Sequence, residues 1–161
     1  MMPWFESKET NNGVWGMHWT MANRNPDNIV NGKPDIASYY HPLIGPYASS
    51  DPKVIDWQLG LMKLSGITGI LMDWPGTSGA LDYAGNLRNA EAIINACEAH
   101  GLEFGIVYED HNLDLAGIPD KIGQGTKDMQ YIQQNYVSKG EFIFKFNSIS
   151  LFPSNQRYLK S

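Results

Sequence analysis

Three stretches of this chain share one pattern: a short apolar run ends in an aromatic residue and an acid, and a helical segment follows. The runs are MMPWFE at residues 1–6, GITGILMDWPG at 66–76 and LEFGIVYEDHN at 102–112. The two longer runs are nearly continuous in apolar residues, which is typical of parallel strands covered on both faces. Because parallel strands end at the same edge of a sheet, we expect Trp, Tyr, Asp and Glu side chains to gather there and to suit a polar ligand with a flat face.

Helical segments lie between these runs. Asp51 followed by Pro52 is a helix start, because an Asp side chain caps the first amide groups and proline fits the first turn. Apolar residues at helical spacing continue to a stop at Gly66, and similar spacing predicts a second helix over about 86–100 and a third over 127–138. A strand directly follows each of the first two helices, so the sequence predicts alternating helices and strands.

The spacing of two acids gives the length of the repeat. Asp73 and Glu109 lie 36 positions apart (109 − 73), close to the roughly 31 residues per unit of an eightfold βα barrel of about 250 residues. The segment EFIFKFNSISLFP at 141–153 is expected to supply one or two more strands, and a polar tail fills 154–161. We therefore expect an α/β protein of the (β/α)8 barrel type, in which residues 1–161 form a single incomplete domain of about four units.

Composition excludes several classes of function. The 161 residues are 42% hydrophobic, enough for one core, and carry a net charge of −5 without a basic run, so nucleic acid is not expected as a partner. No stretch approaches the roughly 20 apolar residues of a membrane span, so no span is expected. The single cysteine, Cys97, lies on the apolar side of the second predicted helix, which indicates a buried structural thiol.

The segment from residue 8 to residue 50 is too long for a plain connection, so we interpret it as a functional loop at the rim of the sheet. It mixes aromatic residues with many Asn, Gly and Pro residues, which suits a surface that offers both ring faces and hydrogen-bonding groups. The alternative is that the rings only anchor the loop to the domain. The residues concerned are Trp15, His18, Trp19, Tyr39, Tyr40, His41 and Tyr47.

Five motifs in a fixed order carry a resemblance to a known family. They are PWF at 3–5, WGMHWTM at 15–21, YYHPLIGPYASSDP at 39–52, GITGILMDWPG at 66–76 and GLEFGIVYEDHN at 101–112. In these motifs the chain resembles the glycoside hydrolase family 71/99-like proteins, a group that includes the endo-α-mannosidases. The likeness spans residues 1–112 and fades past residue 138.

The resemblance implies a (β/α)8 barrel that cleaves an α-linked glycan, of the α-mannan or α-glucan type, without a metal or organic cofactor. Site positions of the family fall on Trp4 or Phe5 at the first strand, on Trp74 after the second and on Glu109 after the third. The family's catalytic carboxylates lie late in the barrel and match no stretch of this chain. We therefore expect the catalytic residues beyond residue 161, and residues 1–161 to be an N-terminal fragment that is inactive alone.

The chain starts directly with its first predicted strand and shows no export signal at Met1. Since the resemblance implies a protein that handles glycans outside the cytoplasm, we expect the signal to lie upstream. The expected location is then periplasmic, extracellular or attached to the cell surface.

Glycoside hydrolysis uses two carboxyl groups on either side of the scissile bond, one protonated and one ionised. Asp73, Glu109 and Asp110 are the carboxyls at the predicted strand ends. We interpret Asp110 as a turn residue, because an acid directly after a strand is common turn chemistry, and Glu109 as the hydrogen-bond partner of a sugar hydroxyl. The full set of predicted glycan-binding residues is Trp4, Phe5, Trp19, Tyr40, His41, Asp73, Trp74, Tyr108, Glu109 and Asp110.

Two alternatives stay open. The first is a non-catalytic glycan-binding half-barrel that self-associates, because an open parallel sheet leaves an exposed edge and apolar surface. The second is a metal-dependent hydrolase barrel, since the chain has four histidines. The chain lacks the His-x-His, HExxH and CxxC spacings of metal sites, so no metal ligand is predicted.

Overall fold

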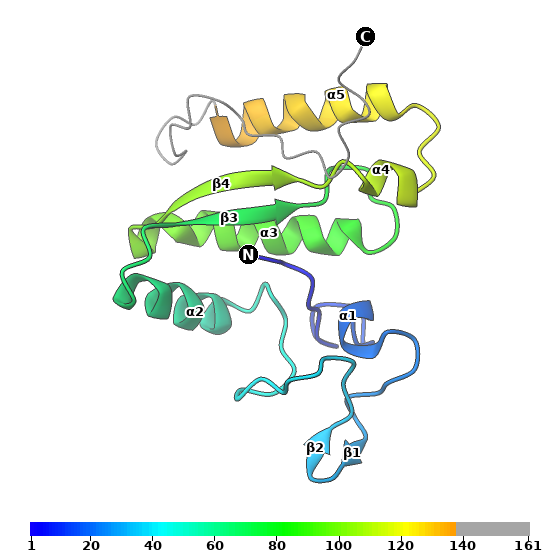
Figure 1. Cartoon of the computed structure of the whole chain (residues 1–161), viewed down its shortest axis with the longest axis vertical. Coiled ribbons are helices and arrows are strands. Elements are labelled where there is room, and N and C mark those ends of the chain that lie inside the picture. Colours follow the sequence, from blue (N-terminus) through cyan, green and yellow to red (C-terminus); the bar gives the residue numbers. More distant parts are fainter. Residues whose placement is uncertain (138–161) are drawn as a thin grey trace.

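The computed structural model describes residues 1–137, and its centre is a pair of parallel strands. Strands β3 (Gly69–Trp74) and β4 (Glu103–Tyr108) pair in register along their whole length. Helix α3 (Tyr83–Cys97) connects them, which makes a βαβ unit (Figure 1). The predicted α/β class with parallel strands is therefore confirmed. Within residues 1–137 the strands form this parallel pair and a short hairpin, and no closed barrel is present.

Helix α2 (Pro52–Leu64) begins where the sequence predicts it. The Asp51 carboxylate accepts hydrogen bonds from the backbone amides of Lys53 at 2.8 Å and Val54 at 3.4 Å. A proline occupies the first turn, where its missing N–H leaves no hydrogen bond unmade. Gly66 follows the helix with a φ of +81°, a left-handed conformation that suits glycine, so the predicted stop is also confirmed.

Helix α3 begins three residues before the predicted start at residue 86 (86 − 83). A 3₁₀ turn (Glu98–His100) prolongs it, and Gly101 then ends the run in the left-handed conformation. The predicted helix and its stop are thus confirmed, with an earlier first turn.

Helix α5 (Lys121–Ile132) begins six residues before the predicted start at residue 127 (127 − 121). Two glycines in its first turns lower its helix propensity, which is why the sequence pattern favours a later start. Asp120 compensates by accepting a hydrogen bond from the Gly123 amide at 2.8 Å. The short helix α4 (Asn112–Leu115) precedes α5, and a π-helical turn (Gln133–Val137) follows it.

The prediction of a strand over residues 1–6 is wrong in detail. The N-terminal segment runs beside β3, where Met1 donates to the Leu71 carbonyl and accepts from the Asp73 amide at 2.9 Å. Pro3 has no N–H to continue such a ladder, so the pairing stops after one residue. The segment then turns to Ser49, whose amide donates to the Phe5 carbonyl at 2.7 Å. It occupies an edge of the sheet without forming a regular strand.

The long loop over 8–50 folds into small elements of its own. It contains helix α1 (Met17–Thr20) and a short hairpin of two-residue strands, β1 (Ile29–Val30) with β2 (Lys33–Pro34), and the hairpin extends away from the sheet (Figure 1). Trp19 anchors the loop, because it is buried and its indole N–H donates to the Tyr47 carbonyl at 2.8 Å.

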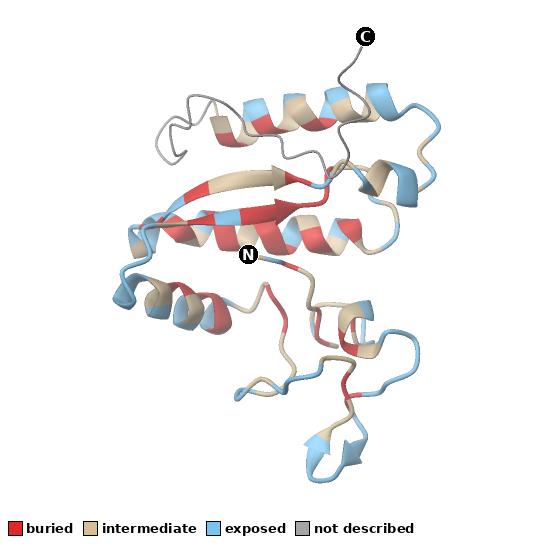
Figure 2. Cartoon of the chain, in the orientation of Figure 1, coloured by how far each residue is buried: buried red, intermediate tan, exposed pale blue. Residues whose placement is uncertain are grey.

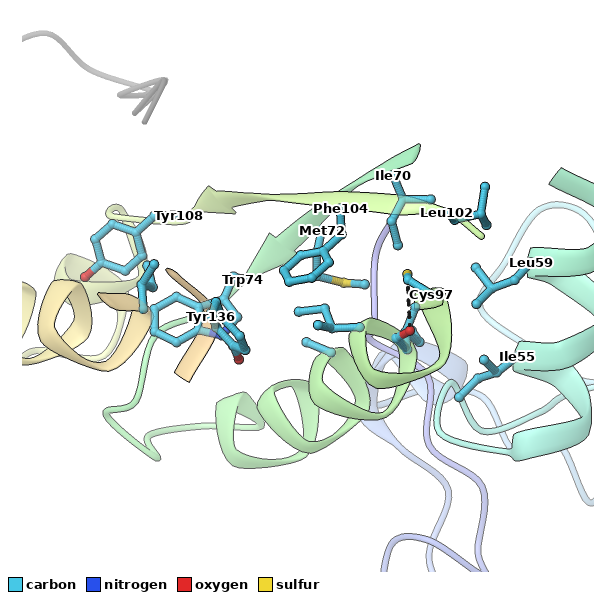
Figure 3. Packing of buried hydrophobic residues seen from close by; sticks show 14 residues of the cluster. Ile55, Leu59, Ile70, Met72, Trp74, Cys97, Leu102, Phe104, Tyr108 and Tyr136 are labelled. Carbon is cyan, nitrogen blue, oxygen red and sulfur yellow. Dashed lines mark hydrogen bonds between the residues drawn. The ribbon is translucent and has the colours of Figure 1, made fainter. Parts of the chain in front are cut away.

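One face of the β3–β4 sheet carries the hydrophobic core. Met72 and Trp74 on β3 and Phe104 on β4 lie on the side that faces α3 (Figure 3). The buried residues of α3 lie along the same interface (Figure 2). Cys97, on α3, is fully buried and close to the Ile93 carbonyl at 3.4 Å, and burial raises the pKa of its thiol to about 11. The prediction of a structural thiol is therefore confirmed.

The opposite face of the sheet is packed less fully. Leu71, next to Met72 in the strand, remains 50% exposed. The expectation that these strands are covered on both faces is therefore not met within residues 1–137.

The expected strands over 141–153, the polar tail over 154–161 and the last residue of the third predicted helix lie outside the described residues. In residues 1–137, no helix has the length and apolar character needed to cross a bilayer.

Replacing Met72 by Ala should lower the free energy of unfolding by about 2–5 kcal/mol, because the change leaves a cavity between the sheet and α3. Leu71→Ala, one position away on the opposite face, is the matched control and should cost less than about 1 kcal/mol, since half of that side chain is already exposed. Urea denaturation followed by circular dichroism measures both values. Equal losses would contradict the assignment of the packed face.

Candidate functional site

The alternation of side chains along β3 and β4 divides the predicted site residues into two groups. Asp73 pairs in register with Val107, and the Glu109 amide donates to the Trp74 carbonyl at 3.1 Å, so Asp73 and Glu109 lie on one face of the sheet. Trp74 and Tyr108 belong to the core on the other face. The sequence pattern expects all four at one rim, whereas only the two acids face away from the core.

A pocket of about 220 Å³ lies at the carboxyl ends of the two strands. Of the predicted residues, it brings together Trp4, Asp73 and Glu109. Its wall also contains polar residues that were not predicted as site residues, and three of them form one connected group. These are His18, Asp82 and Asn86.

Asp73 is the buried acid of this pocket, with 8% of its surface exposed. Burial, followed by the negative charge of Glu109 and hydrogen bonding with it, raises the pKa of Asp73 from its usual 3.8 to about 7. Trp4 and the amino group of Met1 act in the opposite direction but are outweighed. The Oδ1 atom of Asp73 is buried and has no hydrogen-bond partner among the described residues. One oxygen of Asp73 therefore stays without a hydrogen bond in a residue of the pocket wall.

His18, Asp82 and Asn86 form a second polar group in the pocket wall. His18 Nε2 lies 3.0 Å from Asp82 Oδ2, and the Asn86 amide donates to the same oxygen at 3.3 Å. The hydrogen bond from His18 is the main cause that lowers the pKa of Asp82. The His18 ring also stacks on Trp4, with ring centroids 4.9 Å apart. The group thus connects an aromatic wall of the pocket to the start of α3.

The Oδ1 atom of Asn86 is buried and unpartnered among the described residues, like Oδ1 of Asp73. Both atoms can accept hydrogen bonds, and both belong to residues of the pocket wall. Asp82 and Asn86 are four residues apart at the start of α3, but the predicted helix begins only at residue 86, so the sequence offered no reason to place them on one helical face. Nothing in the sequence linked His18 to them.

Trp74 and Tyr108 lie in the core next to the pocket. Trp74 is fully buried, and its indole N–H donates to the Tyr136 hydroxyl at 3.2 Å. The Tyr108 hydroxyl donates to Asp128 at 2.6 Å, and burial with this hydrogen bond raises the pKa of Tyr108 well above its usual value. Neither ring contributes to the wall of the pocket.

Asp128, on α5, is a fully buried carboxylate that holds this region together. One of its oxygens accepts from the Thr77 amide at 2.8 Å, from the Thr77 hydroxyl at 2.7 Å and from Gln124 at 3.0 Å, and the other accepts from Tyr108. These donors offset the cost of burying the acid. Gly76 is required beside it, because a Cβ there would lie 2.8 Å from Asp128 Oδ2. The network fixes the loop after β3 against α5.

Four of the remaining predicted residues lie in or near the long loop, away from the pocket wall. The rings of Phe5 and Trp19 pack against each other with centroids 4.1 Å apart. Tyr40 and His41 are exposed, and His41 Nε2 lies 2.9 Å from the Pro34 carbonyl oxygen. Their predicted roles in glycan binding remain predictions, as does that of Asp110, which is half-buried after β4 and does not line the pocket.

The acidic, histidine and cysteine side chains of residues 1–137 do not form a metal centre. Over residues 1–137, no three His, Cys, Asp or Glu side chains are grouped so that they could hold a metal ion. The pocket therefore offers hydrogen-bond acceptors and an aromatic ring rather than a set of metal ligands.

The chain is similar to known proteins both in sequence and in fold. The chain is 26% identical over 143 residues to a Danio rerio protein described as a glycoprotein endo-alpha-1,2-mannosidase-like protein. Its fold matches the structure of the GH99 endo-alpha-mannosidase from Bacteroides thetaiotaomicron with a TM-score of 0.59 and 16% identity, over 89% of this chain. A structure of that enzyme in complex with bis-tris-propane matches over 80% of this chain, with a TM-score of 0.50 and 18% identity.

The match covers only part of each relative. The aligned region is 84% of this chain but 30% of the Danio rerio protein, and the chain covers 40% and 37% of the two solved chains. No family model matches the chain. The similarity to the solved structures therefore concerns the fold of a part of those proteins.

Replacing Asp128 by Ala should destabilise the protein by about 3 kcal/mol or more, because buried donors from the loop after β3 and from Tyr108 lose their acceptor. Asp114→Ala, on the exposed side of α4, is the control and should change stability by less than about 1 kcal/mol. Thermal and urea denaturation compare the two variants. A stability near that of the parent protein in Asp128→Ala would show that the network does not hold the fold.

The raised pKa of Asp73 predicts a pH dependence of stability. Since the folded state keeps the Asp73 proton up to about pH 7 while the unfolded state loses it near pH 4, the free energy of unfolding should fall as pH rises between these values. Asp73→Asn should remove this part of the decline. Urea denaturation across that pH range measures it, and a carboxyl titration by NMR with a midpoint near 4 for Asp73 would refute the assignment.

Proposed function

We propose that this chain, which is related to the GH99 endo-α-mannosidases over part of their length, forms the glycan-binding part of a glycoside hydrolase for an α-linked glycan. The names of the related proteins favour an α-mannan type of substrate over an α-glucan type. The βαβ unit and the helices around it are, in this proposal, the first part of a (β/α)8 barrel. The fold similarity to an enzyme of known structure supports this, since the chain matches it over most of its own length.

The observation that carries the proposal is the pocket at the carboxyl ends of β3 and β4. It joins two carboxyl groups, Asp73 and Glu109, to the Trp4 ring and to the unpartnered oxygen of Asn86. Sugar hydroxyls are hydrogen-bond donors that suit such acceptors, and the apolar C–H face of a pyranose suits an aromatic ring. The carboxyl ends of parallel strands are also where barrel enzymes bind their substrates.

Asp73 and Glu109 differ in what they offer a sugar. Asp73 is buried with a raised pKa, so below about pH 7 it is uncharged and its proton is engaged in the hydrogen bond with Glu109. Glu109 is exposed at the mouth of the pocket and accepts from a hydroxyl. In our proposal both bind the substrate, and the catalytic pair of carboxyls comes from outside residues 1–161. The isolated chain should then bind glycans without cleaving them.

The test is a binding titration of the folded chain with α-1,2-linked manno-oligosaccharides, followed by NMR and calorimetry. Glu109→Gln keeps the shape of the side chain and removes its charge, so it should weaken affinity by about tenfold or more. Glu103→Gln is the matched control, because Glu103 is exposed at the opposite end of the same strand. It should leave affinity unchanged.

Maltose-derived α-glucans and β-linked cello-oligosaccharides test the class of glycan. The proposal expects α-mannans to bind most tightly and β-linked chains to bind least. Equal affinity of the parent protein and Glu109→Gln for α-mannan would remove Glu109 from the site. Binding of none of these sugars would refute the glycan-binding function itself.

A further inference from the structure

The Asp82 carboxylate does not cap the helix that it precedes. Asp82 is the N-cap residue of α3, a position where an Asp side chain normally accepts hydrogen bonds from the backbone amides of the first turn. Its side chain makes no such bond, and its Oδ2 atom instead lies 3.0 Å from Nε2 of His18, 64 positions away in the sequence. The Asn86 side-chain amide donates to the same oxygen at 3.3 Å. The carboxylate is therefore directed at α1 rather than at its own helix.

The backbone directly before Asp82 is strained. Leu81 has a φ of +51°, in the left-handed region that residues other than glycine rarely adopt. Its side chain is exposed, so burial of that side chain does not hold the conformation. Strained residues persist only where the surrounding structure holds them, and they cluster at binding sites. Leu81 lines the pocket together with His18 and Asp82, so the strain lies where the Asp82 carboxylate is turned toward His18.

The His18 ring is held both at its edge and on its face. The hydrogen bond with Asp82 holds the Nε2 edge of the ring. The face of the ring stacks on Trp4, with centroids 4.9 Å apart and an angle of 26° between the planes. The Phe5 ring meets His18 at nearly a right angle, with centroids 6.4 Å apart. These contacts determine where the imidazole lies and how its plane is tilted.

The backbone beside Trp4 is fixed, whereas its ring lies against His18. Directly after Trp4, Phe5 forms two hydrogen bonds with Ser49, through its amide at 3.1 Å and its carbonyl at 2.7 Å. A fixed backbone still leaves a Trp side chain a choice of rotamers. Within residues 1–137, the ring stack of Trp4 is the one with His18. His18 is therefore the aromatic support for the plane of the Trp4 ring.

The Trp4 side chain also connects to the acids of the pocket. Burial and the negative charge of Glu109 raise the pKa of Asp73, whereas a hydrogen bond with the Trp4 side chain acts in the opposite direction. The orientation of Trp4 thus affects both the aromatic surface of the pocket and the acid beside it.

We propose that His18, oriented by Asp82, is a positioning residue for Trp4 and holds the indole ring in the orientation in which it lines the sugar pocket. His18 then affects sugar binding through Trp4 rather than through a contact of its own. The effect on affinity rests on the proposed glycan-binding function, whereas the effect on the ring does not depend on any ligand. The two effects can therefore be measured separately.

The orientation of Trp4 is measured in the free protein. Three-bond coupling constants across the Cα–Cβ bond of Trp4 report whether the side chain holds one rotamer, and Trp4→Phe assigns the signals. His18→Gln keeps a hydrogen-bond donor for Asp82 and removes the ring, so the couplings should change from those of one rotamer to an average over several. His100→Gln is the matched control, because His100 is also half-buried and pairs with Asp56 at 3.2 Å, just before β4 and away from the pocket. It should leave the couplings unchanged.

The effect on binding is measured with a double-mutant cycle, in which α-1,2-linked mannobiose is titrated into the folded chain and followed by NMR. His18→Gln should weaken binding by about three- to tenfold, because the sugar then meets a ring without a fixed orientation. In the background of Trp4→Leu the same change should have no further effect, because no ring remains to be positioned. Thermal denaturation checks that each variant is folded.

The outcomes separate this inference from the proposed function. A single Trp4 rotamer in His18→Gln would refute the positioning role and leave the glycan-binding function standing. An equal loss of affinity with and without the Trp4 ring would do the same, because His18 would then act independently of Trp4. Averaged rotamers with unchanged affinity would also overturn the inference, since the orientation of the ring would not matter to the sugar. If mannobiose does not bind the parent protein, the proposed function fails, and the rotamer measurement alone decides whether His18 positions Trp4.

Discussion

The in-register pairing of β3 with β4 is the constraint on which the rest of the structure depends. Because side chains alternate along a strand, this register directs Met72 and Trp74 toward the helices and leaves Asp73 and Glu109 on the opposite face. A slip of one residue would exchange the two faces and bury the acids in the core. The burial of apolar side chains against α3 therefore also determines where the two carboxyl groups lie.

The buried carboxylate of Asp128 couples the core to the pocket. It accepts from Tyr108 at the end of β4 and from Thr77 in the loop after β3, and it belongs to α5. The end of β4, the loop after β3 and helix α5 are therefore held together by one side chain. A charge at this depth is tolerated only because hydrogen-bond donors surround it. The network therefore requires these particular side chains, and removing one of them would destabilise the protein. The aromatic residues at the strand ends help to hold this region together: Tyr108 donates to Asp128, and Trp74 donates to Tyr136.

The pocket at the strand ends is made mostly by segments far apart in the sequence. Trp4 comes from the N-terminal segment, His18 from α1 and Asp82 from the start of α3, and they meet through one ring stack and one hydrogen bond. The long loop supplies part of the pocket wall through α1, while its outer hairpin extends away from the sheet (Figure 1). A relationship to GH99 endo-α-mannosidases gives this arrangement its interpretation as a glycan site, and the chemistry of the walls is compatible with it.

The sequence by itself determined the α/β class, the parallel strands, the cap at Asp51 and the buried state of Cys97, because these follow from periodicity and from interactions between neighbouring residues. It also selected Asp73 and Glu109, since an acid after an apolar strand can be recognised locally. Only the tertiary structure decided that Trp74 and Tyr108 belong to the core, that the first predicted strand is an irregular edge, and that His18 lines the pocket. Those outcomes depend on hydrogen bonds and packing between segments distant along the chain, which no local pattern encodes.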